Sequence, residues 1–509
     1  MTRRRRSKRH HGVPDTSHQR KVNYRNLKNP LTLQSAFSED RLEALHQTAL
    51  RVIEELGIRV LNEEARQLFR DAGAQVDKET MMVNIDQAMV ASALETAPSE
   101  FVLAGRTPEF DVEIGGNNIS FVCVGGAPHI ADIDHGKRPG TIEDTRNIIR
   151  LNEHFDVIHL QSPNVEPQDV PVHIRHYATV EAQITLSRKP FFVFSRGSKQ
   201  VADAFEMTRI AYGLSEKEFV AKPWCYTVIN TNSPRQLDIP MCQGIIDFAR
   251  AGQVSVITPF TLAGAMAPVT MSGALVLQHA EALAGVVLSQ IVRPGVPVMY
   301  GSFTSNVDMK SGSPAFGTPE FIQAAFGAGQ LARHIGLPWR GSAATASNAP
   351  DEQSVYEFLN SAWGSVLGGV NVLMHAAGWL EGGLTGSMEK FILDIESLQT
   401  FAEIFDPLNS DDAALAFEAI ANVEPGGHFF GCDHTMERYQ TAFYEPLVSD
   451  WSNFGQWTES GALTATQRAN GIWKQILNDF EAPALEVSRV EAMQAFVERR
   501  KAEGGAPID

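Results

Sequence analysis

The chain has 509 residues, 43% of them hydrophobic, which is enough apolar material for a barrel-sized core with extensions. Its formal net charge of −17 excludes nucleic acid as the main partner, because binding phosphates requires a basic face. No stretch reaches the ~18 uninterrupted apolar residues of a membrane span, since His279 and Glu281 interrupt the nearest one. Four scattered cysteines without a CxxC pair fit a reducing compartment. We therefore expect a cytoplasmic protein that binds neither nucleic acid nor a membrane.

The chain begins with a basic run, MTRRRRSKRHHG, which predicts a disordered, solvated tail over residues 1–24. An arm that binds anions is the alternative, and no apolar segment follows as a secretory signal would require. Residues 25–118 then predict a mainly helical extension with some strand, for example FVLAG. Apolar residues recur there at helical spacing between residues 38 and 56, and Asn62 and Asp86 are candidate N-caps of two further helices.

Over residues 119–405 the pattern changes to short apolar runs, each closed by a turn-forming residue and followed by helical material. Eight runs begin near residues 119, 157, 190, 224, 254, 297, 337 and 370, mostly 30 to 43 residues apart. That spacing accommodates a strand, a loop, a helix and a return. The pattern predicts a (β/α)8 TIM barrel of the α/β class, with a C-terminal helical extension over residues 406–509. An open doubly wound sheet is the alternative, disfavoured because the phosphate loop GxGxxG is absent.

Reactive groups of a (β/α)8 barrel lie where its strands end. The fifth run continues as VSVITPFTLAGAMAPVT, residues 254–270, without one charged side chain. Loops usually carry polar groups because their backbone lies in water, so this one predicts either a covered core crossing or the lining of a dry pocket. Aromatic residues at or near the tips could form a wall around an apolar or cationic ligand, although each by itself is more often a core residue. They are Tyr226, Phe260, Tyr300, Phe303 and Trp339, and His375, Trp379 and Glu381 follow the eighth run.

Standard catalytic motifs such as HExxH, GxSxG and a Walker loop are absent. The segment GGHFFGCDHT brings His428, Cys432 and His434 close in sequence, a spacing that could hold zinc with a further ligand from elsewhere. The segment follows the eighth predicted strand, so structural or interface histidines are the favoured interpretation. We predict no metal of the protein's own.

Several long motifs resemble the trimethylamine methyltransferase family of corrinoid-dependent enzymes. They are ITPFTLAGAMAPVTMSGALVLQHAEALAG, GKRPGTIEDTRNIIRL, GHFFGCDHT, YEPLVSDWSNFGQW and QRANGIWKQIL, and the resemblance runs from about residue 25 to 480. It implies a barrel that takes a methyl group from an amine and gives it to cob(I)alamin on a separate small corrinoid protein. Archaeal trimethylamine enzymes of the family carry pyrrolysine in a region that corresponds to residues 340–353, where none stands here. The chain is more similar in this to glycine betaine:corrinoid methyltransferases, which use quaternary amines.

The lack of an acid–base pair agrees with that branch. Displacement at a quaternary ammonium needs no side-chain base, and its leaving group is a neutral tertiary amine that needs no proton. Because the positive charge is dispersed during transfer, a dry aromatic site favours the reaction. We expect no particular catalytic residue, and a substrate site made by Tyr226, Phe260, Tyr300, Trp339, His375, Trp379 and Glu381.

The sequence also suggests which residues would contact the corrinoid protein and a substrate carboxylate. Leu262, Met266 and Val269, with Phe260, would dock the corrinoid protein, because no DxHxxG-like cobalamin loop occurs in the chain itself. If the substrate has a carboxylate, the candidate donors near the tips are His129, Arg196, Arg340 and His375. We also expect a homo-oligomer. The alternatives from other classes are a barrel protein that binds an amine without catalysis and a metal-dependent lyase or hydrolase.

Overall fold

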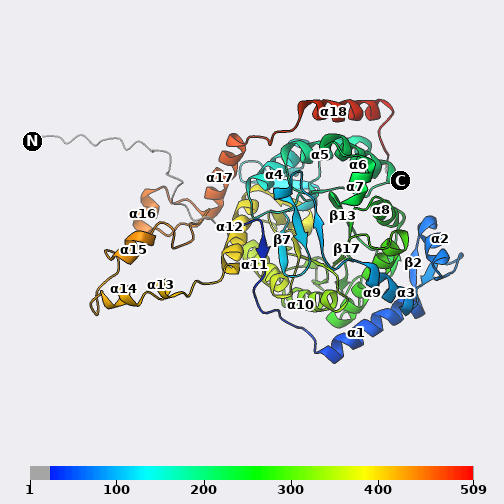
Figure 1. Cartoon of the computed structure of the whole chain (residues 1–509), viewed down its shortest axis with the longest axis horizontal. Coiled ribbons are helices and arrows are strands. Elements are labelled where there is room, and N and C mark those ends of the chain that lie inside the picture. Colours follow the sequence, from blue (N-terminus) through cyan, green and yellow to red (C-terminus); the bar gives the residue numbers. More distant parts are fainter. Residues whose placement is uncertain (1–22, 508–509) are drawn as a thin grey trace, which may run out of the picture. The chain divides into compact units, whose positions relative to one another are not determined.

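A computed structural model describes residues 23–507 (Figure 1), so the predicted basic tail falls almost wholly outside the described residues. One compact unit comprises Tyr24–Phe405 and Val448–Asp509, and a second one includes Asp406–Leu447. The first unit contains the barrel and the candidate site.

Eight parallel strand segments close a ring in the first unit. Seven are β7 (Asn118–Phe121), β12 (Phe191–Phe192), β13 (Cys225–Ile229), β15 (Val254–Ile257), β17 (Val298–Gly301), β20 (Trp339–Ser342) and β21 (Val372–Met374). From β12 to β20 each strand pairs in parallel with the next in chain order, and β21 pairs in parallel with β7. Between β7 and β12, His159 N donates to Phe121 O at 2.9 Å and Gln161 N to Pro190 O at 2.8 Å. The predicted (β/α)8 barrel is therefore confirmed, with its second strand at residues 159–161.

Helices surround this ring, as Figure 1 shows around the labelled strands β7, β13 and β17. They are α4 (Ile142–His154), α5 (Val172–Leu186), α6 (Ser198–Tyr212), α7 (Glu216–Ala221), α8 (Ile239–Arg250), α9 (Met271–Val292), α10 (Pro319–His334), α11 (Glu352–Leu367) and α12 (Met388–Phe405). Several begin at a side chain that accepts a backbone N–H, such as Thr141 before α4 and Asp238 before α8. Among the described helices, α9 alone is long and apolar enough to cross a membrane, and 83% of its most apolar window is buried inside the protein.

The N-terminal extension mixes helices with small sheets. Helices α1 (Glu39–Arg51), α2 (Glu63–Asp71) and α3 (Gln87–Thr96) are present. The predicted caps are confirmed, since Asn62 accepts from Ala65 N and Asp86 from Met89 N. Two sheets accompany them, one of β2 (Ile58–Val60), β3 (Gln75–Val76), β4 (Met82–Asn84) and β14 (Gln236–Leu237), the other of β5 (Phe101–Leu103) and β6 (Val112–Ile114). Residues of β5 and β6 join the core cluster that also takes side chains from the barrel strands.

The C-terminal helices α17 (Ala465–Asp479) and α18 (Val487–Ala502) belong to the barrel unit. Helix α17 is held to α12 by Glu389, whose Oε1 accepts from Asn470 Nδ2 at 2.9 Å and from Trp473 Nε1 at 3.0 Å. Helix α18 is held to α6 by the ion pair of Arg500 with Asp203, at 2.9 Å. The short helix α16 (Phe454–Glu459) precedes them.

Candidate active site

A cavity of about 420 Å³ opens where the barrel strands end. Its walls come from the residues that directly follow the strands, which is where a (β/α)8 barrel carries its reactive groups. Its lining includes Phe194, Arg196, Phe303, Arg340, His375 and Trp379.

Arg340, on β20, is a buried cation that no carboxylate of the described residues pairs with. It is 2% exposed, its Nη1 donates to Ser302 O at 3.1 Å, and its Nε has no partner. No carboxylate of the described residues lies within ion-pair distance of it. Burial lowers the Arg340 pKa to about 9, so the guanidinium is still charged at neutral pH. An uncompensated buried charge is costly, and an anionic ligand in the cavity would compensate it.

His375 lies beside Arg340 and holds a fixed tautomer. Arg340 Nη2 lies 3.3 Å from His375 Nε2, and because a guanidinium can only donate, Nε2 is the acceptor. Nδ1 therefore carries the proton and donates to Ser342 Oγ at 2.7 Å. Burial and the neighbouring guanidinium hold the His375 pKa well below its ordinary value, so the ring is neutral. Its backbone has φ of 60°, a conformation that non-glycine residues adopt rarely and that is often found at functional sites.

Phe303 lies at the centre of an aromatic wall. Its ring centroid is 4.9 Å from that of Phe260, 5.3 Å from Phe316 and 5.2 Å from His375. Trp379 closes the wall at 6.3 Å, and its Nε1 is buried without a partner. Of these rings, Phe303, His375 and Trp379 line the cavity, and the Arg340 guanidinium already lies 5.4 Å from the Phe303 ring centroid.

Trp379 is less available to a ligand than its position in the sequence suggests. Its ring lies 3.7 Å from the His375 ring, centroid to centroid, and a Cβ on Gly383 would approach the indole to 2.5 Å. The indole is thus packed between His375 and the Gly383 backbone. Phe303 is half-buried and lines the cavity, so its ring is the more accessible of the two.

Five predicted residues line the cavity: Arg196, Phe303, Arg340, His375 and Trp379. The structure also distinguishes the two arginines. Arg196 is hydrogen-bonded to Glu166, and its guanidinium lies 4.0 Å from the Phe194 ring centroid. Because the Arg196 charge already has a carboxylate partner, Arg340 is the donor left for a ligand.

Other predicted residues do not line the cavity. Tyr226 is buried in the barrel core and donates to Gln161 O at 2.7 Å, while the Tyr300 hydroxyl faces α9 and lies 2.9 Å from His279 Nδ1. Glu381 binds Lys137 and accepts from Thr385 Oγ1 at 2.6 Å. The ring nitrogen His129 Nδ1 lies 3.3 Å from Leu384 O.

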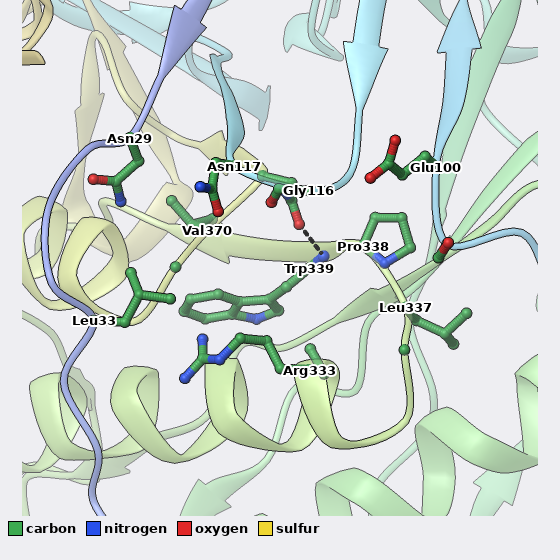
Figure 2. Close-up of a pocket in the computed structure, with 15 residues that line it drawn as sticks. Asn29, Leu33, Glu100, Gly116, Asn117, Arg333, Leu337, Pro338, Trp339 and Val370 are labelled. Atoms are coloured by element: carbon green, nitrogen blue, oxygen red, sulfur yellow. Dashed lines mark hydrogen bonds between the residues drawn. The ribbon is translucent and has the colours of Figure 1, made fainter.

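Trp339 lies at a second cavity, of about 310 Å³, at the opposite end of the barrel. Figure 2 shows its ring beside Leu33 and Arg333. The Trp339 Nε1 donates to Ser302 Oγ at 2.8 Å, and Asn371 Oδ1 accepts from Trp339 N at 2.9 Å. These groups are satisfied by the protein itself, and this end of a (β/α)8 barrel generally contributes stability.

The loop after the fifth strand forms part of a small sheet over the mouth. Its β16 (Leu262–Ala263) pairs with β18 (Ser305–Val307), which pairs with β19 (Pro314–Ala315). Leu262 is buried at 5% exposure, so its side chain is unavailable for docking. Met266 and Phe260 are half-buried, whereas Val269 and Met309 are each 71% exposed. The sequence does not single out Met309, because its neighbours Asp308 and Lys310 are charged.

The structure does not bring the predicted zinc candidates together. Among the described residues, the one group of three whose ligand atoms lie within 4.8 Å of one another is Asp132, Asp134 and His135. Asp132 Oδ1 already accepts from the backbone of both other residues, at 2.9 Å and 2.8 Å. In this group the hydrogen bonds shape a turn. Cys432 Sγ lies 3.3 Å from Thr435 Oγ1, a contact that lowers the Cys432 pKa.

Comparison with known proteins adds the family context. The family model for trimethylamine methyltransferase matches residues 2–505. A glycine betaine methyltransferase of Desulfitobacterium hafniense is 35% identical over 470 residues, covering 92% of this chain and 97% of the relative. Trimethylamine methyltransferases of D. hafniense and Methanosarcina mazei are 31% and 30% identical, each over 95% of the relative and 92% and 91% of this chain. The monomethylamine methyltransferase of Methanosarcina barkeri aligns with a TM-score of 0.47 at 10% identity, over 87% of this chain and 93% of that one.

Proposed function

The chain belongs to the trimethylamine methyltransferase family, and we propose that it transfers a methyl group from a betaine-like quaternary amine to cob(I)alamin on a corrinoid protein. The main support for this proposal is Arg340, a buried cation with no carboxylate partner among the described residues. A simple cationic amine would bring a second positive charge next to it. A betaine brings a carboxylate for Arg340 and an ammonium for the aromatic wall.

Substrate binding would divide between these two surfaces. Arg340 would donate to the carboxylate through its guanidinium, which lines the cavity and has no carboxylate partner among the described residues. The methylated ammonium would lie toward Phe303, where a cation–π contact stabilises it by roughly 0.5–2 kcal/mol. His375 is neutral and accepts from Arg340, so it keeps the guanidinium oriented without adding charge.

A flat macrocycle presented by another protein would dock at the mouth of the barrel. The small sheet β16–β18–β19 covers its rim, and Val269 and Met309 expose apolar side chains there. Cobalamin in its Co(I) state, held by the corrinoid protein, would supply the nucleophile that accepts the methyl group. The residues of this chain bind the amine, exclude water and leave its methyl group directed to the mouth. No side chain is required to move a proton, because the departing tertiary amine is neutral.

Family membership favours an enzyme over a binding protein that has lost catalysis, and over a metal-dependent lyase or hydrolase. We further propose that the enzyme acts as a homo-oligomer in the cytoplasm. None of the four cysteines forms a disulfide, and three of them, Cys123, Cys225 and Cys242, are buried. Free cysteines support a reducing compartment.

A substrate panel tests the proposal. Purified enzyme is mixed with chemically reduced cobalamin and either a betaine (glycine betaine, proline betaine, carnitine or trigonelline) or an amine without a carboxylate (choline, tetramethylammonium or trimethylamine). We expect demethylation of at least one betaine, measured by the absorbance change of cobalamin. Every amine without a carboxylate should have a kcat/KM at least tenfold lower. Equal or better use of choline or trimethylamine would contradict the role given to Arg340.

A further inference from the structure

The segment 406–447 has no core of its own. None of its 42 residues is buried. Nine of its large hydrophobic side chains are exposed, with Leu408 at 96%, Phe430 at 82% and Phe443 at 80%. The other six are Leu415, Phe417, Ile420, Phe429, Met436 and Tyr439.

The helices of this segment are too short to be stable by themselves. Helices α13 (Asp412–Leu415), α14 (Phe417–Ala421) and α15 (Asp433–Arg438) have four, five and six residues. Isolated helices below about 12–15 residues are marginal in water, because nucleation is costly and each turn adds little. A local cap is present, since Asp411 accepts from Ala414 N at 2.8 Å, but a cap contributes only about 1 kcal/mol. The segment therefore needs apolar burial from outside itself.

This exposure is concentrated in one part of the chain. The rest of the described residues, more than ten times as many, expose fifteen large hydrophobic side chains. Scattered exposed apolar residues are normal, whereas a dense group marks an interaction surface. Trp451 and Phe454, exposed at 72% and 79%, follow the segment directly and extend the apolar stretch along the chain.

We propose that segment 406–447 is the contact through which two copies of this chain associate, each copy's segment being covered by the other copy. The cover must be present whenever the enzyme is folded, and a second copy is available at fixed stoichiometry, while a corrinoid protein comes and goes with each turnover. The area supports this occupant. Nine large side chains hiding ~100 Å² each give roughly 900 Å² per copy and about 1,800 Å² for two segments, a size typical of stable interfaces.

A hollow of about 790 Å³ in the segment would receive apolar side chains of the second copy. It lies between Ala416 and Phe417 on one side and Cys432, His434 and Arg438 on the other. The segment also carries eight carboxylates and one arginine, so association brings like charges together. Apolar contact must therefore outweigh repulsion, and salt, which screens the repulsion, should tighten the dimer.

The proposal does not rest on methyl transfer, and it is tested on the full-length protein by sedimentation or mass photometry. We expect the wild type to be dimeric or larger at micromolar concentration, with tighter association in about 0.5 M than in about 0.05 M salt. The double variant Phe430→Ser/Phe443→Ser should weaken self-association at least 100-fold. The matched control Tyr356→Ser/Val487→Ser changes two side chains outside the segment that are 55% and 70% exposed, and it should leave association unchanged.

Hydrogen exchange of wild-type protein gives a second measurement that needs no variant. Amides of residues 406–447 should exchange slowly in concentrated protein and faster on dilution, while those of the barrel strands do not change. A monomeric wild type, a dimer that survives the double variant, or protection that is independent of concentration would each overturn the proposal. Protection that develops only when a corrinoid protein is added would also overturn it, because the occupant would then be that protein.

Discussion

Arg340 donates to His375 across 3.3 Å, and this pair has no carboxylate beside it among the described residues. Ser342 accepts from the other ring nitrogen of His375, so the imidazole fixes the guanidinium while staying neutral. All three side chains come from the ends of the neighbouring strands β20 and β21. The barrel thus builds a preorganised positive charge into a buried wall, and such a charge discriminates between ligands by their sign.

Replacing Arg340 should remove that discrimination. Arg340→Met is expected to weaken glycine betaine binding by about 2–3 kcal/mol, roughly 30- to 150-fold in Kd, because the carboxylate loses a charged donor. Binding of choline, which has no carboxylate, should be unchanged or stronger. Calorimetric titration with both ligands measures the two effects. Arg340→Lys keeps the charge but not the planar fork and should be intermediate. A similar loss for both ligands would indicate a general disturbance of the cavity.

The sequence predicts the barrel well because strands and helices leave a repeating local pattern, and seven of the eight predicted runs contain an assigned barrel strand. The direction in which each side chain points is harder to predict from the sequence. Trp339 and Arg340 are neighbours on β20, and since residues alternate across a strand, the tryptophan packs among the helices while the arginine enters the cavity. A shift of one residue in the predicted register exchanges these roles.

The sequence alone does not show that Arg340, and not Arg196, is the arginine without a carboxylate partner, because this depends on contacts between residues far apart in the chain. Arg196 is paired by Glu166, thirty residues earlier in the chain, and no local pattern predicts that contact. The same limit explains Leu262, which is buried because β16 pairs with β18, more than forty residues later. The sequence shows Phe303 only as one aromatic residue among several near the strand ends. Its central position depends on four other elements meeting around it.

A buried ion pair on α12 should hold the loop that carries Trp379. Lys390 and Asp394 are 0% and 2% exposed and bind each other, and Asp394 Oδ2 also accepts from Gly378 N at 2.9 Å. Asp394→Asn keeps an acceptor for Gly378 but leaves the Lys390 charge alone, and should cost about 3–5 kcal/mol of unfolding free energy. The double variant Lys390→Met/Asp394→Asn removes that lone charge and should regain most of the loss. Urea denaturation compares the three proteins; a double variant no more stable than the single one would contradict the explanation.

Stability should fall as the pH drops below about 6.5. Burial lowers the pKa of His46, His154, His159, His176, His279 and His375 in the folded protein, that of His159 to about 3. Below the ordinary histidine pKa the unfolded chain therefore binds more protons than the folded one, and each such group costs up to ~1.4 kcal/mol per pH unit. Three carboxyls with raised pKa, Asp247, Glu281 and Asp394, act in the opposite direction but are fewer.

Thermal melts at pH 7.5, 6.5 and 5.5 would measure this effect. The melting temperature should fall modestly from pH 7.5 to 6.5, where the unfolded histidines become half protonated, and more steeply from pH 6.5 to 5.5. Because the cause is burial and not long-range repulsion, about 1 M salt should leave the drop in place. A melting temperature that is flat or rises toward pH 5.5 would contradict the assignment of neutral buried histidines.

Docking of the corrinoid protein should depend on Val269 and Met309, because these apolar side chains at the rim are each 71% exposed. Val269→Asp or Met309→Asp is expected to lower kcat/KM with the corrinoid protein at least tenfold, since a charge must then be desolvated at the contact. Methylation of free cob(I)alamin should change less than twofold, because the amine site is untouched. Leu262→Asp serves as a contrast: this buried residue should lower the melting temperature and both activities together. If the two exposed variants impair both reactions equally, or neither, the rim is not the docking surface.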